Sequence, residues 1–210
     1  MKRILSILLA GAMALGLAAC GGPSTPDRTA PAEETQTTPA TDPGDTPSAD
    51  SRALVVYFSA TGNTREVAET LAELQGADLF EIVPAEPYTD EDLNYSDDNC
   101  RANREQNDDS ARPAMASTLE GLDRYDVVYL GFPIWWGTLP KILCTFLETY
   151  DLSGKTVAPF CTSGGSGIGS AEEAIAQLAP GANLTQGLRT DPDSGAADLT
   201  QWLQDIGLES

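Results

Sequence analysis

The stretch ALVVYFSATGNT, residues 53–64, decides the fold that this sequence predicts. Residues 53–58 are a continuous apolar run, rich in β-branched and aromatic side chains, which is typical of a short strand buried on both faces. A polar turn follows and leads into residues 64–75, which carry apolar side chains at helical spacing and end at Gly76. A buried strand that passes through a tight turn into a helix is the first unit of an alternating α/β fold.

The rest of the chain repeats this alternation of strands and helices. Further strands are predicted at residues 78–83, 126–132, 156–161 and 184–188, and further helices within residues 97–109, 139–150, 170–178 and 196–206. Such an alternation implies a parallel sheet with right-handed crossovers. We therefore predict a three-layer, doubly wound α/β fold with a five-stranded sheet. In such sheets ligands bind beyond the carboxyl ends of the strands, so the residues after each strand are the candidates for function.

Composition excludes several classes of function. The 210 residues contain 12 Lys and Arg against 32 Asp and Glu, a formal net charge of −20, and such a polyanion repels nucleic acid. The sequence contains no histidine, which excludes histidine-dependent triads, a histidine general base and histidine-ligated zinc. Its four cysteines form no C-x-x-C pair. We expect neither a metal site nor a catalytic side chain.

Residues 1–19 have the pattern of a secretory signal peptide. Lys2 and Arg3 precede a short apolar run that is rich in Ala and Gly and ends in LAAC, residues 17–20. This tetrapeptide resembles the lipobox of bacterial lipoproteins, which implies cleavage before Cys20 and lipidation of that residue. We therefore expect an extracytoplasmic lipoprotein that is attached to the cell membrane through its lipid anchor only.

Residues 20–51 are predicted to be a disordered linker. Residues 21–50 contain no Val, Ile, Leu, Met, Phe, Trp or Tyr, but six prolines and seven threonines. Such a composition cannot offset the entropy cost of ordering the chain. A binding role for this stretch is the alternative, and we favour the linker that leads to one domain at residues 52–210.

The turn after the first strand, residues 59–64, is a candidate phosphate site. Its hydroxyls, amide and glycine surround the start of a helix, where backbone N–H groups and the helix dipole favour an anion. Arg65 is the nearby candidate cation. The turn lacks the G-K-[ST] of a Walker loop and the G-x-G-x-x-G of dinucleotide sites, which favours a mononucleotide. A helix start capped by a side chain uses the same residue types and is the alternative interpretation.

Two further loops follow predicted strands. Residues 133–140 contain the adjacent Trp135 and Trp136, which either cap the core, as tryptophan usually does, or offer a face to a planar ring. Their position at the carboxyl end of a strand favours the second role for at least one of them. Residues 162–170 contain four glycines, which let a backbone approach a ligand closely, although a flexible loop has the same composition.

Together the three loops resemble those of the flavodoxin family, most closely a flavodoxin-like branch with PIWWG and T-x-x-G-S-G loops, over residues 52–209. The resemblance implies strand order 2-1-3-4-5 and FMN as the cofactor, with Trp135 or Trp136 stacking on the isoalloxazine. Ser163 stands where that branch usually has histidine. The residues that the resemblance assigns to FMN are Ser59, Thr61, Gly62, Asn63 and Thr64 at the phosphate, Pro133, Ile134, Trp135, Trp136 and Gly137 around the ring, and Thr162, Ser163, Gly164, Gly165 and Gly167 at its polar edge.

These expectations favour an FMN-binding electron-transfer protein with a redox partner protein or a small electron acceptor. Electron transfer by a flavin needs no side-chain base, which suits a chain without histidine. Removal of Lys2 and Arg3 leaves a mature charge of −22, which is expected to lower the flavin potential. Two alternatives stay open: an FMN-dependent NAD(P)H:acceptor oxidoreductase of the quinone type, and a flavin-free lipoprotein that is a binding module.

The acid-rich stretch at residues 84–121 is predicted to be a solvated flap over one end of the sheet. A substrate or partner contact by Arg101, Arg104 or Arg112 is the less favoured alternative. Cys144 and Cys161 are predicted to fill the core.

Overall fold

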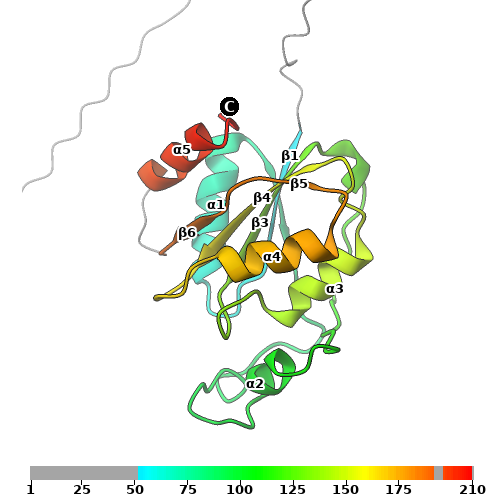
Figure 1. The fold of residues 1–210 in the computed structure, drawn as a ribbon, viewed down its shortest axis with the longest axis vertical. Helices are drawn as coiled ribbons and strands as arrows, with labels where there is room; N and C mark the ends of the chain where they lie inside the picture. The colour runs from blue at the N-terminus through cyan, green and yellow to red at the C-terminus, as the bar shows by residue number, and fades with distance from the viewer. Residues whose placement is uncertain (1–51, 192–195, 210) are drawn as a thin grey trace, which may run out of the picture. The chain divides into compact units, whose positions relative to one another are not determined.

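A parallel sheet covered by helices on both faces organises the part of the chain that the computed structural model describes, residues 52–191 and 196–209 (Figure 1). The predicted signal peptide, Cys20 and the predicted linker lie outside these residues. The strands are β1 (Ala53–Tyr57), β2 (Asp78–Glu81), β3 (Val127–Pro133), β4 (Thr156–Thr162), β5 (Asn183–Leu184) and β6 (Leu188–Thr190). The helices are α1 (Asn63–Gln75), α2 (Arg101–Gln106), the 3₁₀ turn η1 (Leu122–Arg124), α3 (Lys141–Thr149), α4 (Gly169–Leu178) and α5 (Ala196–Asp205).

The strand order is β2-β1-β3-β4-β5, and every pairing is parallel. This confirms the expected order 2-1-3-4-5. Residues 184–188 were predicted as one strand, which is wrong, because β5 and β6 pair separately with the two halves of β4. Between them the Gly187 N–H donates to Glu172 Oε1 (2.6 Å), and the Gln186 carbonyl accepts from Trp202 Nε1 (3.0 Å). Side chains of α4 and α5 therefore hold both polar groups of the peptide that lies between β5 and β6.

Alternation along the strands divides the core into two layers. On one face Leu54, Val56 and Phe58 pack with apolar residues of α3 and α4. On the other face Val55 and Tyr57 pack with apolar residues of α1 and α5. Burial on both faces explains why the central strands read as continuous apolar runs.

The stretch at residues 84–121 contains only the short helix α2, which Figure 1 shows set apart from the sheet on the side of α3. Its arginines have partners inside the protein. Arg101 pairs with Glu105 (2.6 Å), and Arg112 pairs through two nitrogens with Glu148 on α3 (2.7 and 2.8 Å). Arg104 donates to the carbonyl of Asn99. These contacts support a structural role for the three arginines.

The three described cysteines, Cys100, Cys144 and Cys161, are free and buried. Burial raises the pKa of the Cys161 thiol to about 12, so this side chain stays neutral and apolar at pH 7. Cys144 and Cys161 therefore fill the core, as predicted.

Within residues 52–191 and 196–209, no helix combines the length and the apolar character that crossing a membrane requires. The same residues contain no cluster of three or more His, Cys, Asp or Glu side chains that could hold a metal ion.

Candidate functional site

A pocket of about 530 Å³ lies beyond the carboxyl ends of β1, β3 and β4. The loops that follow these strands come from separate parts of the chain, and parallel pairing brings them to one edge of the sheet. The pocket is lined by Ser59, Ala60, Thr61, Asn63, Thr64, Asp90, Leu93, Tyr95, Pro133, Ile134, Trp135, Thr162, Ser163, Gly164 and Asp191.

The start of α1 supplies backbone donors at one side of the pocket. Gly62 occupies the N-cap position with φ +96°, a conformation that glycine adopts without strain. Its N–H donates to Ser59 Oγ (3.1 Å), which closes the turn. No side chain caps α1, although the first N–H groups of a helix have no partner within the helix. Asn63 and Thr64 lie at this uncapped start and line the pocket, so the arrangement favours an anion over a conventional cap.

A buried hydroxyl pair joins the first loop to the end of β4. Thr64 Oγ1 and Thr162 Oγ1 lie 2.8 Å apart, and both residues are almost completely buried. Each hydroxyl has one hydrogen to donate, and their mutual bond uses only one of the two. The pair therefore fixes the two loops relative to each other and leaves one donor for another acceptor.

The two tryptophans have different environments. Trp135 is 3% exposed and packs edge-to-face against Phe58 (centroids 5.5 Å apart) and Tyr88 (5.1 Å). Trp136 is 41% exposed and lies 4.9 Å from the ring of Tyr95. Trp135 caps the core and also lines the pocket, whereas Trp136 packs beside Tyr95, which is itself a lining residue.

A tight turn separates the two tryptophan environments. The N–H of Trp135 donates to the Thr138 carbonyl (2.9 Å), and the N–H of Thr138 donates back to the Trp135 carbonyl (3.1 Å). Trp136 has φ +47° and Gly137 has φ +82°, as the central residues of a type I′ turn do. A bulky side chain at positive φ is rare, and such strain concentrates at ligand-binding loops.

The glycine-rich loop after β4 is shaped by Ser163. Its Oγ accepts from the Gly165 N–H (3.2 Å), and its carbonyl accepts from the guanidinium of Arg189 on β6 (3.0 Å). A hydroxyl therefore organises this loop locally at the position where the similar branch usually has histidine.

Charge at the pocket is negative. The lining residues include Asp90 and Asp191 and no lysine or arginine, although the carboxylate of Asp191 pairs with Arg189 on β6 (3.9 Å). Arg65, the cation expected near the phosphate, is instead paired with Glu81 (2.6 Å). An anion at the start of α1 would therefore be held by neutral donors and the helix dipole.

Most of the residues expected around FMN line this pocket. The other five expected residues lie in the same loops but do not line the pocket, namely Gly62, Trp136, Gly137, Gly165 and Gly167. Five lining residues were missed: Ala60, which lies inside the predicted phosphate turn, and Asp90, Leu93, Tyr95 and Asp191. Asp191 follows the last strand directly, so the rule about carboxyl ends could have found it. The other three come from the acid-rich stretch, whose path over the pocket has no local sequence signal.

Comparisons with known proteins identify the family of the chain. The Flavodoxin family model matches residues 52–206. A provisionally assigned flavoprotein from Bacteroides eggerthii is 42% identical, with a TM-score of 0.72, and the match covers 75% of this chain and 99% of that chain. A second one, from Bacteroides uniformis, is 42% identical, with a TM-score of 0.70 and coverage of 73% and 97%.

A flavoprotein from Lactobacillus acidophilus, solved in complex with FMN, is 24% identical, with a TM-score of 0.55 and coverage of 72% and 98%. At this identity the likeness shows the fold. No curated protein matches the chain.

Proposed function

Because the chain belongs to the flavodoxin family, we propose that it is an FMN-binding electron-transfer protein. The observation that carries this proposal is the pocket itself. Three loops meet there around an uncapped helix start, and all three are the loops in which the sequence resembles flavin-binding proteins. A lone helix cap or a lone glycine-rich loop would not require this convergence.

The chemistry of the donor set fits FMN. Hydroxyls of Ser59, Thr61 and Thr64, together with the free N–H groups at the start of α1, form a neutral cradle for a phosphate. Ile134 and Trp135 give an apolar wall for a flat ring. The volume of about 530 Å³ lies within the range of small-molecule sites, roughly 300–1,000 Å³.

Bound FMN supplies one- and two-electron transfer, and the protein supplies binding, orientation and electrostatics. The tight turn at Trp135 and Trp136 sets the position of the wall, and the Thr64–Thr162 pair fixes the phosphate loop relative to the glycine-rich loop after β4. The carboxylate of Asp90 adds negative charge at the pocket, whereas that of Asp191 pairs with Arg189 (3.9 Å), and the charge of Asp90 disfavours further negative charge on a reduced cofactor. We therefore propose a lowered reduction potential.

We also propose that the protein is a lipoprotein on the outer side of the cell membrane, anchored through Cys20. The support is the lipobox at residues 17–20 and the composition of residues 21–50. An extended linker of about 30 residues at ~3.1 Å per residue would reach roughly 90 Å. Such a tether would let the domain meet a redox partner protein, or a small acceptor, at a distance from the membrane.

Titration of the full chain with FMN tests the proposed function. We expect quenching of flavin fluorescence with a stoichiometry of one, and release of the flavin on denaturation. Riboflavin, which lacks the phosphate, should bind at least about tenfold more weakly, because it makes no contact with the start of α1. No quenching at large excess of FMN would favour the flavin-free binding module. Steady oxidation of NAD(P)H with a quinone would favour the oxidoreductase.

A further inference from the structure

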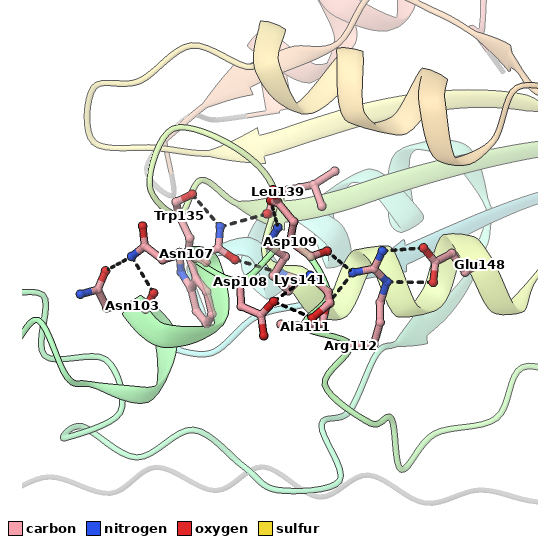
Figure 2. A network of polar contacts seen from close by, with 12 residues as sticks. Asn103, Asn107, Asp108, Asp109, Ala111, Arg112, Trp135, Leu139, Lys141 and Glu148 are labelled. Atoms are coloured by element: carbon pink, nitrogen blue, oxygen red, sulfur yellow. Dashed lines mark hydrogen bonds and ion pairs between the residues drawn. The ribbon is translucent and has the colours of Figure 1, made fainter.

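The last residue of α2, Gln106, holds the loop of residues 133–141 at three points. Its Nε2 donates to the carbonyls of Trp135 (3.0 Å) and Leu139 (3.2 Å), and its Oε1 accepts from the backbone N–H of Lys141 (3.0 Å). Figure 2 shows Trp135, Leu139 and Lys141 gathered at this point beside α2. One amide therefore satisfies backbone groups on both sides of the tight turn.

The loop needs this support because its own residues form few hydrogen bonds that would hold it in place. Trp136 holds positive φ, and only two backbone hydrogen bonds close the turn. The helix α3 starts after Pro140, which offers no side-chain cap. Gln106 supplies the missing acceptor for Lys141 from a different segment of the chain, as an N-cap side chain would.

The acid-rich stretch also holds the side chain of Trp135. Tyr88 packs edge-to-face on its ring (5.1 Å), and the Tyr88 hydroxyl donates to Glu105 (2.5 Å), the residue before Gln106. Next to Lys141 Nζ lies the carboxylate of Asp109 (3.2 Å). Residues 84–121 therefore hold both the backbone and the ring of Trp135 in the pocket wall.

We infer that Gln106 is a positioning residue for the cofactor wall, acting through the backbone of Trp135. This inference rests on the proposed function, and it makes cofactor affinity dependent on a stretch that otherwise has the composition of a solvated flap. The amide does not line the pocket itself. Its removal should therefore change binding by displacing Trp135.

The test compares Gln106→Ala and Gln106→Glu in the full chain with the control Asn107→Ala. Asn107 is the next residue, but its amide bonds only to the carbonyl and the side chain of Asn103, inside the α2 region (Figure 2). We expect Gln106→Ala to weaken FMN binding about tenfold or more, because all three hydrogen bonds that hold the wall are lost. Asn107→Ala should bind within about twofold of the wild type.

Gln106→Glu separates positioning from general destabilisation. The carboxylate can still accept from Lys141, but it faces the carbonyls of Trp135 and Leu139 without a hydrogen to donate. Binding relative to the wild type should be weakest near pH 8 and should recover on acidification, as the carboxyl protonates above its usual pKa of about 4.3, because the two carbonyl oxygens disfavour its charged form. A variant that only lowered stability would not recover on acidification.

Equal FMN affinity of the wild type and both Gln106 variants would overturn the inference while leaving the proposed function intact. Failure of the wild type to bind FMN would instead contradict the proposed function. In that case hydrogen exchange of the flavin-free protein decides the inference. Faster exchange at the amides of Thr138 and Lys141 in Gln106→Ala would support the positioning role, and unchanged exchange would overturn it.

Discussion

At the scale of the residue, Gly131 shows how close packing between neighbouring strands restricts which residue fits at one position. It lies on β3 opposite Phe160 on β4, and a Cβ atom added to it would come within 2.2 Å of the Phe160 ring. We predict that Gly131→Ala lowers the free energy of unfolding by about 1–3 kcal/mol, because the ring can move only by disturbing the core. Urea denaturation of the flavin-free protein measures this change.

Gly165→Ala is the matched control. A Cβ atom at Gly165 meets no atom within 4 Å, and the residue does not hold positive φ. We expect a change within about 0.5 kcal/mol. A Gly131→Ala protein as stable as the wild type would show that Phe160 repacks freely, contrary to the close packing seen between β3 and β4.

At the scale of the element, the start of α1 combines a favourable site for negative charge with a proposed site for phosphate. A carboxylate in the first turn of a helix interacts favourably with the helix dipole, by about 0.3–1 kcal/mol. We predict that Asn63→Asp leaves the flavin-free protein as stable as the wild type or slightly more stable. The same change should weaken FMN binding about tenfold or more by repelling the phosphate, and should leave riboflavin binding unchanged.

Gln204→Glu adds the same charge on α5, next to the residues Leu74 and Gln75 at the far end of α1, and serves as the control. It should leave FMN and riboflavin binding unchanged. Equal weakening of both ligands by Asn63→Asp would mean that the phosphate does not lie at the start of α1.

At the scale of the whole molecule, we predict that the free energy of unfolding is constant over a broad pH range around neutrality, because the chain has no histidine to titrate there. Burial raises the pKa values of Tyr129 and Cys161 to about 12. A raised folded pKa contributes stability that is complete below the unfolded pKa and is lost as the pH rises through the folded value. Arg112 lowers the pKa of Glu148, and a backbone hydrogen bond from Thr89 lowers that of Asp92, so their contributions are lost as the pH falls through those values.

We therefore expect the urea midpoint to stay flat from about pH 6 to pH 8.5, to fall between about pH 9 and pH 12, and to fall again below about pH 4. Urea denaturation across this pH series checks the profile. A step near pH 6.5 would contradict it, because it would require a titrating group that the described residues do not provide.

The sequence by itself determined the alternating fold and most of the pocket. Apolar runs such as residues 53–58 and the helical spacing in residues 64–75 are local signals, and parallel pairing then brings the loops after β1, β3 and β4 to one edge. Local patterns also predicted β2 and the C-terminal helix, and the helix buries Leu199, Trp202 and Leu203 on one face.

Only the tertiary structure decided which tryptophan is buried, where Arg65 points and that the fifth strand divides into β5 and β6. Trp135 and Trp136 are adjacent residues of the same type, and the difference in their burial arises from a turn closed by backbone bonds and from Gln106 and Tyr88. The contacts of Gln106 with the loop join residues about 30 or more positions apart, and such long-range contacts have no periodic signature along the chain.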